Sequence, residues 1–332
     1  MQVQSKKKKQ TKSKPTLKVP KLSLLLGLLV LIALIVFVYM HVGDTKKFLS
    51  LLGSAEPWWL VFAIGMQIAT YMSVGLIWFR ITHSAKFYIP LGALARLSLE
   101  KLSVDQFLPA LGMSGNLVVY QAMKRLRLPR WLALEAILIN ILAHYIAYAI
   151  VTALALVALA YFYHVTPIIL TLAGVFVIVL IFVPTVVLWL VAHKDKKLPS
   201  WLLRFNLVTK AKKVLKSVTP KQIFDPKLLV FASFFNIIVF LLDSGTLWAV
   251  LHSLGISATF FTAFIALILA SVAATLSALP GGLGGFEAAS VGLLTLMHVP
   301  LEAALAGTLI LRGFTLWLPL LPGLFFARKD TV

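Results

Sequence analysis

The sequence predicts an all-α membrane protein with six transmembrane helices and two re-entrant helical hairpins, arranged as two inverted repeats. Hydrophobic residues make up 60% of the 332 residues, and charged residues only 13%. Several apolar runs exceed the roughly 18 residues that a membrane-spanning helix needs. Most lysines and arginines lie in short clusters at the ends of these runs, as the positive-inside rule expects of membrane proteins.

Six apolar runs are uninterrupted, and each predicts one transmembrane helix. They cover residues 22–41, 58–81, 131–163, 167–192, 228–251 and 301–327. The first run follows a basic tail, residues 1–21, that contains eight lysines. This run is too long for the apolar region of a signal peptide and lacks a small-residue cleavage site, so we expect an uncleaved first span.

Two further apolar stretches, 91–123 and 256–297, are interrupted near their middle by Leu-Pro and glycines. Each is either a span with a loop or a hairpin that enters the bilayer and returns to the same side. The charges favour the hairpin, because re-entry places every strong basic cluster on the side of the tail 1–21. The sequence therefore predicts that both chain termini lie in the cytoplasm.

The two interruptions resemble each other. "LPALGMSGNLVVYQAMKRLRLP" (108–129) aligns with "LPGGLGGFEAASVGLLTLMHVP" (279–300), pairing both Leu-Pro dipeptides and both later prolines. Three spans separate the hairpins, so the halves are expected to be inverted, as in many transporters. We expect one transmembrane domain, 22–327, with repeats at about 22–163 and 167–327. The alternative is chance similarity between apolar sequences.

The formal net charge of +20 does not by itself indicate nucleic-acid binding. The positive-inside rule explains 26 of the 31 basic residues, and anionic lipid headgroups are the partners expected for them. The polar segment 193–227 carries ten of these residues and has apolar residues at near-helical spacing. It predicts an amphipathic helix on the cytoplasmic surface, with a solvated linker as the alternative.

The glycine-rich interruption "PGGLGGFE" supplies the main candidate binding site. Its members are Pro280, Gly281, Gly282, Gly284 and Glu287. Glycines permit turns whose free amides form an anion-binding nest, and a helix that begins near Glu287 adds a positive N-terminal dipole. This combination suits a phosphate group. The alternative is that Glu287 only caps its own helix.

Arg312 lies about eleven residues into the last predicted span, near the centre of the bilayer. A charge at that depth is costly unless it is paired or faces a water-filled cavity. Glu287 is the nearest candidate partner in sequence. Arg312 therefore either forms a structural salt bridge with Glu287 or binds a substrate phosphate during part of a transport cycle.

Other polar residues inside apolar runs are weaker candidates. Arg96 and Glu100 are four residues apart and either pair locally or join Lys101 in a first-half site. Asn140 and His144 share a helix face, and Asp243 interrupts the fifth span. For these three, an interhelical hydrogen bond is the main expectation, and a proton route through His144 or Asp243 is the alternative.

Motifs for catalysis or metal binding are missing from the sequence. The seven histidines form no zinc-binding pattern, cysteine is absent, and there is no nucleophile elbow or Walker loop. We therefore expect no metal and no cofactor. An intramembrane enzyme that uses Glu287 as a general base stays open, but no second catalytic group stands beside this residue.

The second-half motif "LPGGLGGFEAASVGLLTLMHVP", Arg312 and "LWLPLLPG" resemble the flippase-like integral membrane family, also called the lysylphosphatidylglycerol synthase transmembrane region. The resemblance implies lipid handling. Well-known members add an aminoacyltransferase domain after such a region and move the modified lipid to the outer leaflet. This chain ends just after the membrane region, so we expect that it does not make lysylphosphatidylglycerol itself.

The first half departs from the family pattern. The family usually shows Gly-Glu followed by an arginine near the first broken turn, whereas here Gly115 is followed by Asn116, and Val119 occupies the basic position. The resemblance therefore transfers binding roles only to the second-half residues. These are Pro280, Gly281, Gly282, Gly284, Glu287 and Arg312.

Together, these observations predict a flippase-like lipid translocase in a prokaryotic plasma membrane. Its expected substrate is an anionic or aminoacylated phospholipid or a polyprenyl-phosphate carrier. The alternatives are a non-transporting membrane partner that recruits a separate lipid-modifying enzyme, and an intramembrane transferase. Nucleic acid is not an expected partner.

Overall fold

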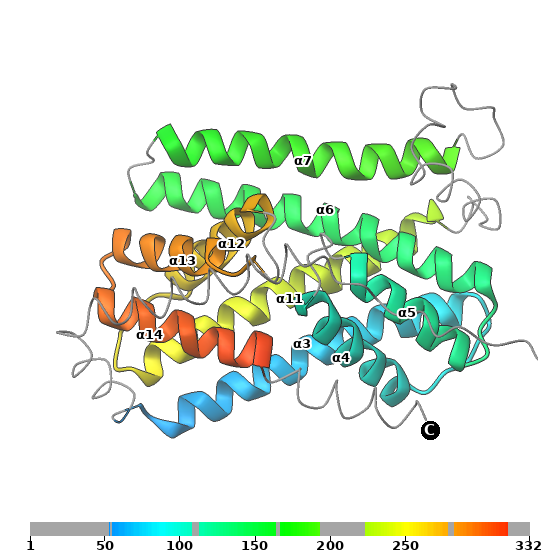
Figure 1. Cartoon of the computed structure of the whole chain (residues 1–332), viewed down its shortest axis with the longest axis horizontal. Coiled ribbons are helices and arrows are strands. Elements are labelled where there is room, and N and C mark those ends of the chain that lie inside the picture. The colour runs from blue at the N-terminus through cyan, green and yellow to red at the C-terminus, as the bar shows by residue number, and fades with distance from the viewer. Residues whose placement is uncertain are drawn as a thin grey trace, which may run out of the picture.

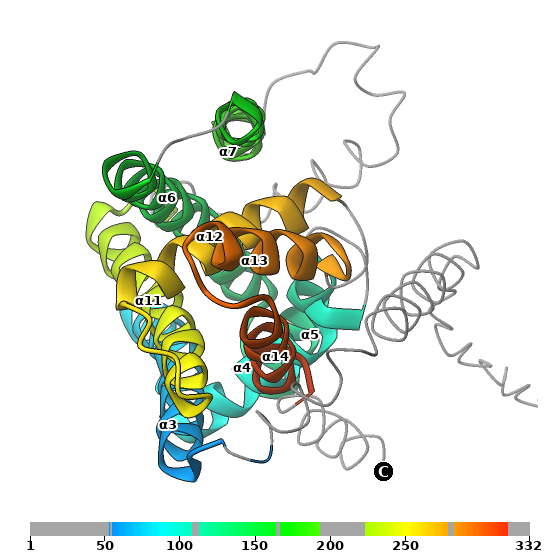
Figure 2. The same ribbon diagram turned by 90° about the vertical axis from the view of Figure 1, so that its left-hand side faces the viewer.

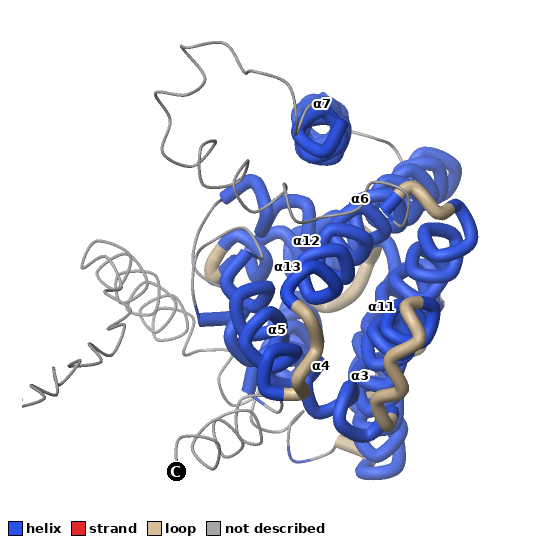
Figure 3. Tube along the Cα trace, turned by 90° about the vertical axis from the view of Figure 1, so that its right-hand side faces the viewer, coloured by secondary structure: helices blue, strands red, loops and turns tan. Residues whose placement is uncertain are grey.

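The computed structural model describes residues 53, 55–107, 113–163, 167–192, 223–277 and 282–317. In these residues the chain forms helices joined by short turns, with no strand (Figure 3). The elements are α3 (Pro57–Ser84), α4 (Leu91–Phe107), α5 (Met113–Arg125), α6 (Arg130–Phe162), α7 (Pro167–Ala192), α11 (Pro226–Ser253), α12 (Phe260–Ser277), α13 (Gly285–Leu296), α14 (Leu301–Arg312) and the π-helix η3 (Gly313–Trp317).

Four helices are long and apolar enough to cross a membrane: α3, α6, α11 and α12. At 1.5 Å per residue, the 28 residues of α3 and of α11 extend about 42 Å, more than the hydrocarbon core of a bilayer. The protein is therefore an all-helical, multi-pass membrane protein. The predicted first span 22–41, the segment 193–222 and residues 318–327 lie outside the described residues.

The longest helix contact joins α3 and α11, which run antiparallel (Figure 1). At one end, the Glu56 amide donates to the Ser253 carbonyl over 2.8 Å. At the other end, the Arg80 guanidinium lies 5.9 Å from the centre of the Phe231 ring. Because Glu56 precedes α3 and Ser253 ends α11, these contacts fix the antiparallel direction along the whole pair.

The order and size of the elements recur along the chain. Proline begins both 28-residue helices, α3 and α11, and each is followed by a turn with a positive φ, at Lys86 and at Gly255. Next come α4 with 17 residues and α12 with 18, then α5 with 13 and α13 with 12. A second positive-φ turn, at Arg127 and at His298, leads into α6 and α14.

Two large apolar cores lie along α6. One joins α3, α4, α5 and the start of α11 to the first half of α6 and includes the fully buried Trp78. The other joins the second half of α6 to α7, α11, α12, α13 and α14. Figure 2 shows α14 beside α13, with α12 between α13 and α6. These contacts place the break between α12 and α13 inside the helix bundle.

The outward faces of several helices are apolar. On α7, the side chains of Ile178, Ile181 and Phe182 are exposed, whereas Phe176 and Leu180 pack toward the neighbouring helices. Exposed Val230 and Phe234 give α11 a similar outer face. Lipid chains are the natural cover for surfaces of this size and composition in a membrane protein.

Candidate functional site

The break between α12 and α13 is built on left-handed glycines. Gly282 has φ 66° and Gly284 has φ 83°, a region that glycine occupies without the steric penalty of a side chain. Gly284 is the N-cap residue of α13. The predicted turn is therefore present at Gly282 and Gly284, while Pro280 and Gly281 lie outside the described residues.

Close packing is a second reason for glycine at this break. A Cβ atom at Gly282 would lie 2.5 Å from the Cβ of Ala274 on α12. At Gly285, a Cβ atom would lie 2.8 Å from the hydroxyl of Ser277. Gly285 was not among the predicted site residues, although it belongs to the same "PGGLGG" motif.

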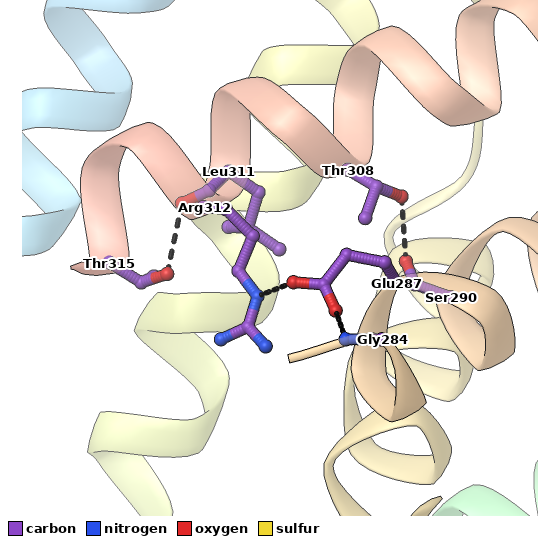
Figure 4. Close-up of polar contacts among 7 residues, drawn as sticks. All are labelled: Gly284, Glu287, Ser290, Thr308, Leu311, Arg312 and Thr315. Atoms are coloured by element: carbon purple, nitrogen blue, oxygen red, sulfur yellow. Dashed lines mark hydrogen bonds and ion pairs between the residues drawn. The ribbon is translucent and has the colours of Figure 1, made fainter. Parts of the chain in front are cut away.

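Glu287 uses its two carboxylate oxygens for two different purposes (Figure 4). Oε2 accepts a hydrogen bond from the Gly284 amide over 2.6 Å, which caps the N-terminus of α13. Oε1 lies 2.6 Å from Nε of Arg312, which donates a hydrogen bond to it. The helix cap and the salt bridge, each expected from sequence as an alternative to ligand binding, are thus both present.

Arg312 is the last residue of α14, and its surroundings are almost closed. Arg312 and Glu287 are each 8% exposed. The guanidinium carbon of Arg312 lies 4.2 Å from the centre of the Phe286 ring, a cation–π distance. A hydrogen bond of 2.9 Å between Ser290 and Thr308 makes a second polar contact between α13 and α14 (Figure 4).

The helix changes its geometry directly after Arg312. Residues Gly313–Trp317 form the π-helix η3, and the Thr315 hydroxyl donates to the Leu311 carbonyl over 3.0 Å. Short π-helical turns are rare and occur frequently at functional sites. The sequence pattern gave no signal for this change, because Gly313 alone does not distinguish a π-helix from an α-helix.

The site combines one cation, one anion and the positive end of a helix. Glu287 neutralises Arg312 and also accepts a hydrogen bond from the Gly284 amide at the start of α13. An incoming phosphate is also negatively charged and also presents oxygen acceptors, so it can compete with Glu287 for both donors. Chemically, the arrangement can exchange an internal carboxylate for an external anion.

The first-half candidates form a different ion cluster. Glu100 is buried and lies 2.7 Å from Nη2 of Arg125 and 3.4 Å from Nε of Arg96. The local pair of Arg96 and Glu100 was expected, whereas Arg125 was counted only as part of a basic cluster. Lys101 of α4 and Asn116 of α5 are partly buried.

Asn140 and His144 make the interhelical contacts that the sequence favoured for them. Nδ2 of Asn236 on α11 donates to Oδ1 of Asn140 at 3.5 Å, and Nδ1 of His144 lies 3.2 Å from Oδ1 of Asn236. The partner Asn236 was missed. Its only signal is an amide inside an otherwise apolar run.

Asp243 lies at the contact between α3 and α11. Its Oδ1 accepts hydrogen bonds from Nε2 of Gln67 at 3.0 Å and from the Thr70 hydroxyl at 3.2 Å. Neither donor was singled out from sequence, and neither was Glu135, an acid fully buried on α6. Among the described residues, no three histidine, aspartate or glutamate side chains are grouped to hold a metal ion.

Fold and site together define a helical, multi-pass membrane protein with a buried arginine–glutamate pair at a broken helix. More particularly, the chain belongs to the family described as the lysylphosphatidylglycerol synthase TM region, whose model matches residues 24–323. This match confirms the resemblance noted in the sequence. No curated protein matches the chain.

Proposed function

We propose that this protein moves a phosphate-bearing lipid between the two leaflets of a prokaryotic plasma membrane. The substrate class is an anionic or aminoacylated phospholipid or a polyprenyl-phosphate carrier. The observation that carries the proposal is the buried pair of Arg312 and Glu287 at the N-terminus of α13. Membership of a family named for a lipid-modifying membrane region supports a lipid as the ligand.

In the proposed cycle, the lipid phosphate replaces Glu287 at Arg312 and at the Gly284 amide that precedes α13. Arg312 pairs well with phosphate because its planar guanidinium donates several hydrogen bonds in one direction. The displaced Glu287 then binds a cationic substituent of the headgroup or takes up a proton. Either event avoids leaving an unpaired carboxylate inside the membrane.

Two inverted repeats are part of the proposal, with α3–α6 equivalent to α11–α14. The recurring element lengths and positive-φ turns support the equivalence. Equivalent helices that pack antiparallel, as α3 and α11 do, are related by a twofold axis perpendicular to them. For two membrane spans, such an axis lies in the membrane plane, which is the geometry of inverted repeats in transporters.

The proposed topology has six spans and two re-entrant hairpins, α4–α5 and α12–α13. Both termini and the segment 193–227 face the cytoplasm, together with the basic turn 124–130 between α5 and α6. The turns 253–259 and 298–300 contain no lysine or arginine and face outside. This arrangement follows the positive-inside rule at every basic cluster.

A leaflet-transfer assay tests the proposal. The purified protein is reconstituted in liposomes with fluorescent lipids that carry neutral, anionic or lysyl headgroups, and exchange between leaflets is followed by selective quenching. We expect transfer of the anionic or lysyl lipid above the rate of protein-free liposomes. Folded protein that transfers none of these lipids, or polyprenyl phosphate, would support the alternative of a partner for a separate enzyme.

A further inference from the structure

The antiparallel pair of α3 and α11 allows an internal comparison. Each helix begins with proline, at Pro57 and Pro226, and each has a histidine bonded to the carbonyl four residues earlier, at His83 and His252. Residue i of α3 therefore corresponds to residue i + 169 of α11. Because the helices run antiparallel, a residue pair i and j + 169 that faces across them has a twin pair of positions, j and i + 169.

The contact of Thr70 with Asp243 and its twin differ in polarity. Thr70 corresponds to Val239, and Asp243 corresponds to Val74, so the twin position holds two valines. Val74 is buried, and Val239 packs against the same apolar core. At the twin positions the chain thus has two apolar side chains that pack in or against the core, and no carboxylate.

Tyr71 also has an apolar counterpart on the other helix. The hydroxyl of Tyr71 is buried without a hydrogen-bond partner among the described residues, and Tyr71 lies within electrostatic range of Asp243. Its counterpart on α11 is Phe240, which packs in the apolar core without a hydroxyl. Three polar groups, on Thr70, Tyr71 and Asp243, therefore occur where their counterparts Val239, Phe240 and Val74 are apolar, whereas the counterpart of Gln67 is the polar Asn236.

We call Gln67, Thr70, Tyr71, Asp243 and Thr246 the crossing cluster. Nε2 of Gln67 donates to both Asp243 and Thr246, at 3.0 Å each. Thr70 lies at the midpoint of α3, so the cluster is deep in the membrane. Asp243 is its only formal charge, and the side chains of described residues that bond to Asp243 are neutral.

A lone carboxylate in the middle of a membrane span is costly unless a positive charge compensates it. We infer that the crossing cluster binds one monovalent cation, either a proton or a sodium ion, on the carboxylate of Asp243. One positive charge neutralises the cluster, whereas a divalent ion would leave it charged. The carboxylate of Asp243 and the hydroxyl oxygens of Thr70 and Thr246 are hard oxygen ligands that suit a sodium ion, whereas Gln67 presents its amide nitrogen to Asp243 and Thr246.

The cation site is connected to the lipid site by α14 and η3. One face of this segment packs Ile310 and Phe314 against Ala63 of α3 and Val250 of α11. Its other face presents Arg312 to Glu287 on α13. A shift of α14 relative to the crossing cluster therefore moves Arg312 as well. Coupling of cation binding to lipid movement rests on the proposed function, but the cation site does not.

Thermal melting of the full chain in lipid nanodiscs tests the site without any transport assay. A ligand that binds only the folded protein raises its Tm with ligand concentration, by about 2 °C or more for each tenfold increase. Sodium is varied against a large organic cation at constant ionic strength, and pH is varied without sodium. Tyr71 of α3 is a titratable residue within electrostatic range of Asp243, whereas Glu287 and Arg312 pair with each other.

The variants are Asp243→Asn and the double change Thr70→Val with Asp243→Val, which copies the valine pair Val74 and Val239. Asp225→Asn, which neutralises the half-buried acid that caps α11, is the matched control. We expect the wild type and the control to share a Tm response to sodium or to pH that both Asp243 variants lack. The double variant should melt at or above the wild-type Tm, because it replaces a lone buried carboxylate by the apolar side chains that occupy the twin positions.

A sodium response identifies a sodium site, and a pH response alone identifies a proton site. The inference is overturned if the Tm of the wild type and that of Asp243→Asn respond equally to sodium and to pH. It is also overturned if lysyl lipid shifts the Tm of the wild type and neither cation does. If the cation response is found but no lipid is transferred under any gradient, the site stands and the proposed function fails. If lipid is transferred at a rate that does not depend on the cation gradient, the proposed coupling is wrong.

Discussion

Arg312 donates from Nε to Oε1 of Glu287 over 2.6 Å, while Oε2 of the same carboxylate caps α13 through the Gly284 amide. One side chain therefore holds both the buried cation and the start of the helix. Both partners are almost fully buried, so neither can lose the other without leaving a charge in a poorly solvated position.

Removal of the cation should destabilise the protein more than neutralisation of the anion. We expect Arg312→Ala to cost about 3–5 kcal/mol, because it leaves Glu287 buried and unpaired. Arg312→Lys should cost less, since it keeps a positive charge. Glu287→Gln should also cost less than Arg312→Ala, because its amide oxygen still accepts a hydrogen bond from one of the two donors that the carboxylate binds. Expression and thermal melting in detergent measure these differences, and equal stability of the three variants would contradict the pairing.

The glycines at the hairpin break should respond to an added methyl group according to their surroundings. Gly282→Ala combines an unfavourable positive φ with a clash against Ala274, so we expect a clear loss of thermal stability. Gly292→Ala is the matched control, because it lies within α13 and has no atom within 4 Å of the added Cβ. This control should be neutral or slightly stabilising. Equal Tm changes in the two variants would argue against tight packing at the break.

The charge of Glu287 should affect headgroup selection. Glu287→Gln keeps the shape and a helix-capping oxygen but cannot carry a negative charge. We expect this folded variant to lose its preference for lysyl over neutral headgroups and to show a different pH dependence of lipid transfer. Parallel liposome assays with both lipids across pH measure this change. An unchanged preference and an unchanged pH profile would restrict Glu287 to a structural role.

Cysteine labelling tests the topology, since the chain contains no native cysteine. Ser200→Cys and Thr331→Cys should resist a membrane-impermeant thiol reagent in intact cells, because both positions are proposed to face the cytoplasm. Ser257→Cys, in the exposed turn between α11 and α12, is the matched control and should react. Reaction of Ser200→Cys at the rate of the control would rule out the inverted-repeat topology.

Helix positions were predictable where local signals were strong. The predicted spans 58–81 and 228–251 became Pro57–Ser84 and Pro226–Ser253, since an initial proline and an unbroken apolar run define each helix. The pair of Glu287 and Arg312 was also predictable, because a buried cation needs an acid and few acids are available. The sequence did not show, however, that Glu287 would bond to Gly284 and to Arg312 at the same time, because this depends on how α13 packs against α14.

Long-range partners could not be predicted from one sequence. Gln67 and Asp243 are 176 residues apart, and glutamine in an apolar helix does not indicate which acid it meets. Arg125 belongs to a basic cluster that the positive-inside rule already explains, so its contact with Glu100 had no separate signal. Such contacts arise from the crossing of whole helices, which the periodicity of one helix does not determine.

The most direct test of the central claim uses a neutral version of the buried pair. The double variant Glu287→Gln with Arg312→Gln leaves no unpaired charge and retains hydrogen-bonding groups, so it should fold with a Tm close to that of the wild type. Its rate of transfer for anionic and lysyl lipids is measured in liposomes beside the wild type. We predict wild-type transfer well above the protein-free rate and double-variant transfer at that rate, because no cation remains to receive the phosphate. A folded double variant that transfers lipid at the wild-type rate would contradict the proposed role of Arg312.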